Sequence, residues 1–306
     1  MAPLSAPRPP GAAPAPEPAP PSPIPAGARD PRAPDPAIDD PLTDFAAHPF
    51  PHAGVTYPVY TAGAGPAVIL LAELPGISPQ VARLARWIRD AGFAVYLPAL
   101  FGVDGAYPQA AAGLAEARRI CVRAELGALA AGAAAPITAW LTALARAAHA
   151  ARGGPGVGAI GMCLTGNFAI AMMIEPAVRA SVACQPSTPL GAPDAIQLAP
   201  DEARAIRARL EREDLTVRAY RFAGDRHCTA ARFAAYAEAL GPRFVARVLP
   251  DDAAHPAPPP FFAQVVGGPH SVLTAHLIDA AGEPTRAARD EILAFLAHRL
   301  RPEPTP

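Results

Sequence analysis

Short apolar segments alternate with helical segments over residues 52–300, and this alternation restricts the fold more than any other feature of the sequence. Strands are predicted at 54–60, 66–74, 94–100, 156–163, 180–186, 214–224 and 243–250. Helices are predicted at 78–93, 109–150, 164–175, 201–213, 229–240 and 286–300. Near-continuous apolar strands that alternate with helices indicate a parallel sheet buried on both faces. The predicted fold class is therefore α/β, a doubly wound and mainly parallel sheet with helices on both faces.

The two ends of the chain differ in composition from the part between them. Residues 1–40 contain 14 prolines and almost no large apolar side chain. Such a segment cannot bury enough surface to offset the entropy lost on ordering. We therefore predict a disordered Pro/Ala-rich tail at 1–45, one folded domain at 46–301 and a frayed end at 302–306. A role of the tail in partner binding is the less favoured alternative.

Bulk composition restricts the partners and the location of the protein. Hydrophobic residues make up 51% of the 306 residues, enough for a sizeable core, and the net charge is −1. We find no basic patch of the kind that holds a nucleic-acid backbone. Apolar runs are shorter than the roughly 18 residues needed to span a membrane, and the N-terminus lacks the apolar core of a secretory signal. We expect a cytoplasmic monomer that binds neither nucleic acid nor membranes.

The cysteines give the first indication of chemistry. Four are present, at 121, 163, 184 and 228, and none forms a CxxC pair. This spacing argues against a disulfide framework or a zinc ribbon. We interpret three of them as reduced, buried core residues. The fourth, Cys163, ends the apolar run VGAIGM and precedes a helix that is rich in small residues.

The sequence around Cys163 is similar to a nucleophile elbow, the tight strand-to-helix turn with the pattern G-x-[S/C]-x-G. Gly161 holds the first small position, whereas Thr165 holds the second and Gly166 follows one residue later. The turn would expose the thiol at a helix N-terminus, where the helix dipole favours a thiolate. The alternative is an ordinary core cysteine, which behaves as a small hydrophobic residue.

Two further residues follow Cys163 in an informative order. Asp225 comes directly after the predicted strand 214–224; alone, it could be a turn residue or a helix cap. His270 lies in the loop segment VVGGPHSVLT before the last helix. Nucleophile, acid and histidine follow one another in this order in α/β-hydrolases. Asp225 would orient the ring of His270, which would take the proton of Cys163.

A catalytic cysteine also needs two aimed donors for the oxyanion that forms when it attacks a carbonyl group. The amide of Leu164, directly after the nucleophile, is one candidate. The second is expected from the turn after the early strand 66–74, near Leu74.

Four segments of the chain resemble the dienelactone hydrolase family: LLAELPGISPQVARLARWIRDAGFAVYLPALFG, GAIGMCLTGNFAI, YRFAGDRHC and GGPHSVLT. The resemblance implies an α/β-hydrolase fold and a triad of Cys163, His270 and Asp225. It further implies hydrolysis of a small ester or lactone through a thioester, with no metal and no other cofactor. Glu73 would help to activate Cys163 when substrate binds, and Leu74 would complete the oxyanion hole. Alternatively, Glu73 is only a solvated strand end, although a buried charge is costly unless it is paired or functional.

The chain departs from this family in the residues expected around the substrate. Members carry an arginine four residues after the catalytic histidine to hold a substrate carboxylate, but this position is Thr274. The sequence Gln185–Pro186 stands where aromatic residues are expected. The pocket is therefore expected to be altered. A second carboxylate-binding arginine could be any of Arg118, Arg119 and Arg123.

Two other functions are compatible with the sequence. In the first, the fold persists as a binding or redox-responsive module, and Cys163 oxidises or binds electrophiles without turnover. In the second, a metal is held by His227, Cys228 and His270, although their spacing matches no usual ligand pattern.

Overall fold

The structure is a computed structural model, and it describes residues 30–121, 136–187 and 194–301. The chain divides into a short unit, Met1–Asp30, and a large unit, Pro31–Pro306. All the strands and helices given below belong to the large unit.

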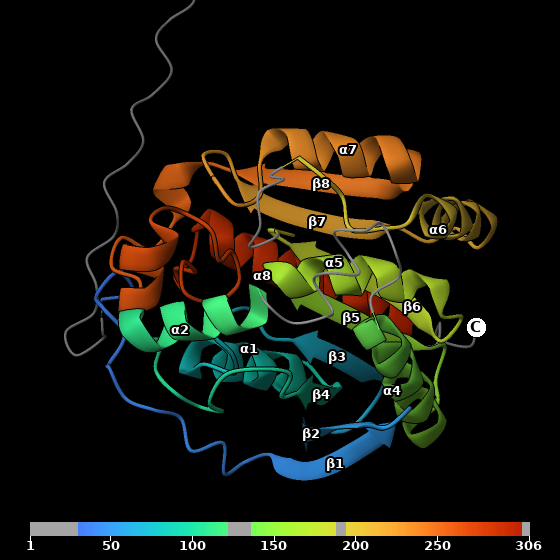
Figure 1. Cartoon of the computed structure of the whole chain (residues 1–306), viewed down its shortest axis with the longest axis horizontal. Helices are drawn as coiled ribbons and strands as arrows, with labels where there is room; N and C mark the ends of the chain where they lie inside the picture. The colour runs from blue at the N-terminus through green and yellow to red at the C-terminus, as the bar shows by residue number, and fades with distance from the viewer. Residues whose placement is uncertain (1–29, 122–135, 188–193, 302–306) are drawn as a thin grey trace, which may run out of the picture. The chain divides into compact units, whose positions relative to one another are not determined.

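An eight-stranded sheet forms the centre of the large unit (Figure 1). Its strands are β1 (Ala46–His52), β2 (Val55–Ala62), β3 (Ala67–Leu71), β4 (Ala94–Pro98), β5 (Val157–Met162), β6 (Val178–Cys184), β7 (Val217–Phe222) and β8 (Phe244–Leu249). They lie in the order β1-β2-β4-β3-β5-β6-β7-β8. The pairs β1–β2 and β2–β4 are antiparallel and all the others are parallel. The predicted α/β class with a mainly parallel sheet is confirmed.

Helices cover both faces of this sheet. They are α1 (Pro79–Asp90), α2 (Ala110–Cys121), α4 (Pro136–Arg152), α5 (Leu164–Ala171), α6 (Pro200–Arg212), α7 (Ala230–Leu240) and α8 (Pro284–Leu300). Buried residues of α4, α5, α6 and α7 belong to one apolar cluster, and those of α1 and α8 to a second cluster on the other face (Figure 1). None of the described helices is both long enough and apolar enough to cross a membrane.

Local sequence signals account for several of these elements. The predicted helix at 78–93 is present as α1, and the hydroxyl of Ser78 accepts a hydrogen bond from the amide of Val81 (3.2 Å) at its start. Strand β1 was not predicted. It carries two prolines, which a strand tolerates only at the edge of a sheet, and β1 is indeed an edge strand. The predicted helical stretch 109–150 contains α2 and α4, and residues 122–135 between them lie outside the described residues.

The residues before β1 contact helix α1 through charged side chains. Arg86 on α1 donates hydrogen bonds to the carboxylates of Asp40 (2.6 Å) and Asp44 (2.7 Å), which lowers the pKa of both acids. Leu42 and Phe45 are buried against the same face of the sheet as α1. Part of the segment that composition assigns to the tail therefore contacts the folded domain.

The order of the strands brings the chemically interesting residues to one edge of the sheet. Glu73 follows β3, Cys163 follows β5 and Asp225 follows β7. These strands are parallel, and only β6 separates β5 from β7. Ligands of open α/β sheets bind at the carboxyl ends of the strands, so we expect a functional site at this edge.

Candidate active site

Cys163 lies in a strained turn between β5 and α5. Its φ of 55° and ψ of −126° fall in a sparsely populated region of backbone space, a conformation that costs of order 1–3 kcal/mol and is concentrated at functional sites. The turn has no room for a side chain at the glycines on either side of Cys163. A Cβ on Gly161 would lie 2.1 Å from the carbonyl oxygen of Thr165. A Cβ on Gly166 would lie 3.0 Å from the Cα of Pro186.

Thr165 occupies the elbow position at which the pattern expects a small residue. Its hydroxyl accepts a hydrogen bond from the amide of Met162 (2.9 Å) and lies 3.1 Å from the carbonyl oxygens of Leu71 and Ala72. Thr165 is fully buried. The threonine thus ties the elbow to the end of β3, so the imperfect match to the pattern has a structural role.

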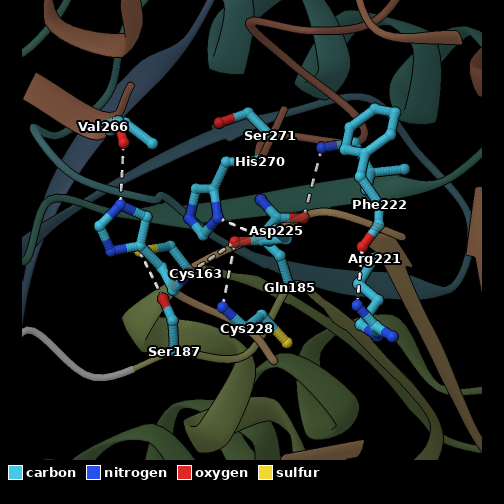
Figure 2. Close-up of polar contacts among 12 residues, drawn as sticks. Cys163, Gln185, Ser187, Arg221, Phe222, Asp225, Cys228, Val266, His270 and Ser271 are labelled. Atoms are coloured by element: carbon cyan, nitrogen blue, oxygen red, sulfur yellow. Dashed lines mark hydrogen bonds and ion pairs between the residues drawn. The ribbon is translucent and has the colours of Figure 1, made fainter. Parts of the chain in front are cut away.

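His270 and Asp225 form a buried, hydrogen-bonded pair beside Cys163 (Figure 2). Nδ1 of His270 lies 2.8 Å from Oδ2 of Asp225, and the two residues are 2% and 4% exposed. The other carboxylate oxygen accepts hydrogen bonds from the amides of His227 (2.9 Å) and Cys228 (3.0 Å). Asp225 therefore caps the start of its own loop and orients the imidazole at the same time.

The charges of this group depend on one another. Burial alone would raise the pKa of Asp225, but His270 and the two amides lower it below its usual value. Burial also opposes charge on His270. The carboxylate of Asp225, together with electrostatic and hydrogen-bonding interactions with Cys163, outweighs this effect and raises the pKa of His270 well above its usual value. The structure thus brings the three predicted side chains together in one place.

Glu73 is buried close to this group, and its carboxylate is held by uncharged donors. The hydroxyl of Ser271 donates to Oε2 (2.7 Å), the amide of Gln185 donates to the same oxygen (3.2 Å), and the hydroxyl of Thr274 donates to Oε1. Glu73 is only 1% exposed, and burial raises its pKa despite these hydrogen bonds. Thr274 stands at the position of the family's arginine, so here a neutral hydroxyl contacts the glutamate.

The loop that carries His270 is fixed by His276, for which no role was expected, and by Gln185, which the sequence marked only as a departure from the family. The amide of Ser271 donates to Nδ1 of His276 (3.1 Å), and burial lowers the pKa of His276 to about 3, which keeps that ring neutral and able to accept. The amide of Val272 donates to Oε1 of Gln185 (3.3 Å). Only the position of Gln185, at the end of a strand, could have indicated its role.

Another residue with an unpredicted role, Ser187, contacts the sulfur itself. It follows β6, and its Oγ lies 3.0 Å from Sγ of Cys163 (Figure 2). The signal that could have found it is the same one that identified Asp225, a polar residue just after a buried strand.

A mostly apolar cavity of about 270 Å³ opens next to Cys163. Its polar walls are Glu73, Ser187, His227, His270 and Arg118. The apolar walls come largely from α2 and the short helix Phe262–Val266, which contact each other: Leu74, Leu114, Ala117, Phe261, Phe262, Val265 and Val266. The catalytic candidates therefore face a space that suits the apolar part of a small molecule.

The two candidate oxyanion donors lie where the sequence predicts them, at the start of α5 and in the turn after β3. Leu164 is the first residue of α5, and the first amides of a helix have no partner within the helix. Leu74 lies in the turn after β3, where the amide of Gly76 donates to the carbonyl of Glu73 (2.9 Å), and it lines the cavity.

The three candidate arginines lie in different places. Arg118 lines the cavity. Arg119 does not line it and pairs instead with Glu116 (2.6 Å). Arg123 lies outside the described residues.

The remaining cysteines and the possible metal ligands can also be placed. Cys184 and Cys228 are buried free thiols whose pKa is raised by burial, as expected of core residues. The side chain of Cys121 lies outside the described part of the chain. Within the described residues, no group of three or more His, Cys, Asp or Glu side chains is arranged to hold a metal ion.

The sheet order, the strained cysteine elbow and the buried His–Asp pair after the later strands together define an α/β-hydrolase. The chain belongs to the dienelactone hydrolase family, because the model of that family matches residues 54–236. Membership of this family makes the protein a hydrolase of the kind that acts on esters. No curated protein matches the sequence of this chain.

Solved structures agree with this fold. The chain is similar to a putative dienelactone hydrolase from Klebsiella pneumoniae, with a TM-score of 0.52, 18% identity and coverage of 83% of this chain and 98% of that one. A dienelactone hydrolase from Anabaena variabilis gives a TM-score of 0.51, 18% identity and coverage of 84% and 98%. A cold-adapted esterase from an Arctic intertidal metagenomic library gives a TM-score of 0.51 and 14% identity, with coverage of 86% of this chain and 97% of that one.

Proposed function

We propose that this protein hydrolyses a small ester or lactone through a thioester on Cys163. The observation that carries the proposal is the buried His270–Asp225 pair beside the strained Cys163, at the mouth of an apolar cavity. Cys163, His270, Asp225 and the two oxyanion donors all belong to one chain, so we propose that a monomer is active without a metal or organic cofactor.

In the first half of the reaction, the proton of Cys163 moves to His270, whose raised pKa favours the imidazolium. The sulfur attacks the carbonyl carbon and forms the C–S bond, while the π electrons of the carbonyl move to its oxygen. The amides of Leu164 and Leu74 would stabilise this oxyanion. The C–O bond to the leaving group then breaks, the alkoxide takes the proton from His270, and a thioester remains.

Water completes the reaction. His270 takes a proton from the water as its oxygen attacks the thioester carbonyl. The C–S bond breaks and the sulfur leaves as a thiolate, which gives the free acid and restores the thiolate beside an imidazolium. Asp225 keeps the ring in one orientation throughout and stabilises its charge.

The acyl-enzyme can be detected directly. We expect rapid acid quenching after mixing with a p-nitrophenyl ester to leave one acyl group on Cys163 in a mass spectrum. Cys163→Ala should lose both this mass and turnover, whereas the buried thiol variant Cys228→Ala, like Cys121→Ala, should keep both. Acylation and turnover that persist in Cys163→Ala would rule out the mechanism. Acylation without turnover in the native protein would instead favour a binding or redox-responsive module.

The lining of the cavity supports a substrate class: an ester with an apolar acyl chain that ends in a carboxylate. The apolar walls suit the chain, and Arg118 supplies a positive charge at the wall of the cavity. A hydrogen bond to a charged group contributes about 1.5–3 kcal/mol when it is shielded from water, and somewhat less at an exposed arginine.

Arg118→Ala is therefore expected to raise KM for a p-nitrophenyl hemiester of a dicarboxylic acid roughly three- to tenfold. KM for the neutral ester of similar length should not change. Steady-state kinetics on both substrates provides the measurement. The matched control is Arg119→Ala, since Arg119 pairs with Glu116 outside the cavity. An equal rise in KM for both substrates would contradict the assigned role.

A further inference from the structure

The Cys163 sulfur contacts a side chain outside the predicted triad, that of Ser187. Oγ of Ser187 lies 3.0 Å from Sγ, and Ser187 is 3% exposed and lines the same cavity (Figure 2). The contact joins the loop after β6 to the elbow after β5, two neighbouring strands of the sheet. The hydroxyl therefore touches the atom that would react.

The backbone of Ser187 is held in place independently of any substrate. Its amide donates to the carbonyl of Cys163 (3.1 Å), and its carbonyl accepts from Nδ2 of Asn167 (2.9 Å). Asn167 also donates to the carbonyl of Leu164 and accepts from the hydroxyl of Tyr236 (2.6 Å). The rotation of the hydroxyl is the main freedom left to Ser187, and it points toward the sulfur.

The chemistry of the two atoms sets the direction of this contact. A neutral thiol can donate or accept, but a thiolate has no proton and can only accept. The hydroxyl must then be the donor, and a hydrogen bond to an ionised group is stronger than one between neutral groups. The contact therefore favours the thiolate over the thiol, and over the thioester, whose sulfur is a weak acceptor.

We propose that Ser187 is a further catalytic residue whose hydroxyl donates to the Cys163 thiolate. The inference rests on the proposed function, in which that thiolate forms twice. Before attack, the hydrogen bond would raise the fraction of ionised sulfur and hold it toward the cavity. When the thioester breaks, the same donor would stabilise the sulfur as it leaves.

Alkylation by iodoacetamide tests this role without any ester. Rates are measured against pH for the native protein and for Ser187→Ala, with mass spectrometry to confirm that Cys163 is the modified residue. We expect the curve of Ser187→Ala to be displaced to higher pH, with alkylation near pH 6 slowed about tenfold. The control is Ser181→Ala, which removes a buried hydroxyl that donates to the carbonyl of Ala169 (2.8 Å). Its curve should coincide with that of the native protein.

A second pair of variants covers the case in which Ser187→Ala does not fold. Ser187→Thr keeps the hydroxyl. Ser187→Val has almost the same size as Ser187→Thr but carries a methyl group in place of the hydroxyl, so only the pH curve of Ser187→Val should be displaced. Coinciding curves for these two, or for Ser187→Ala and the native protein, would overturn the role of Ser187. The proposed function would then stand, provided that Cys163→Ala remains unlabelled by the ester.

Discussion

Replacing Asp225 with asparagine is expected to lower kcat for ester hydrolysis by roughly 10³–10⁴-fold, by analogy with other histidine–acid pairs. The asparagine oxygen can still accept the amides of His227 and Cys228, which leaves its NH₂ group facing Nδ1 of His270. Nδ1 must then accept, so the ring proton moves to the other nitrogen. That nitrogen can no longer take the proton of Cys163.

Single-turnover and steady-state kinetics measure this loss. The control is Asp251→Asn, because Asp251 holds the same loop by accepting the amide of Gly224 (2.7 Å) but does not contact His270. We expect Asp251→Asn to keep most of the activity. A kcat for Asp225→Asn within tenfold of the native value would mean that Asp225 does not determine the tautomer of His270.

Stability against pH provides a second readout of the same variant. The folded pKa of Asp225 lies below its usual value, so its contribution to stability is present above the unfolded pKa and is lost as pH falls through the folded pKa. The folded pKa of His270 is raised, so its contribution is lost as pH rises through that value. The difference in free energy of unfolding between the native protein and Asp225→Asn should therefore be largest above the unfolded pKa of Asp225 and below the folded pKa of His270. It should shrink in acid.

Replacing Glu73 with glutamine is expected to lower kcat/KM by roughly 10²-fold without loss of stability. We propose that the carboxylate takes part in activating Cys163 when substrate enters the cavity, as the family resemblance implies. It lines the cavity, and three neutral donors hold it there. An amide of the same shape keeps the packing but cannot accept a proton at neutral pH.

Unfolding experiments separate this role from a structural one. Burial raises the pKa of Glu73, so the folded state binds more protons than the unfolded state, and stability falls as pH rises between the two pKa values. Glu73→Gln should remove this fall and be at least as stable as the native protein near pH 7. Glu175→Gln is the control: this buried glutamate pairs with Arg146 (2.5 Å), away from the cavity, and should lose stability but not activity. Full activity in Glu73→Gln would assign Glu73 to packing alone.

The carboxyl ends of parallel strands meet at one edge of a sheet, which is why part of the site could be predicted from the sequence. Cys163, Asp225 and Glu73 each come directly after an apolar run that forms a strand, and such runs can be recognised without coordinates. Strand β1 could not be predicted in this way because two prolines interrupt its pattern. Its pairing with β2 as an edge strand depends on a neighbour in space.

The arginines illustrate the limit of local reasoning. Arg118 and Arg119 are adjacent and have the same chemistry, yet only Arg118 reaches the cavity. Successive residues of a helix point about 100° apart, so the side that faces the site depends on how α2 packs. That packing depends on the short helix Phe262–Val266, which lies far away in the sequence.

The sequence by itself determined the fold class and the nucleophile–acid–histidine order, because strand periodicity and the glycines of the elbow are local properties. Only the tertiary structure decided which groups surround the sulfur. Ser187 and the donors to Glu73 come from loops after other strands, and their contacts exist only once the sheet has assembled. A polar residue after a strand acquires such a role only through proximity, and proximity between distant segments is set by packing.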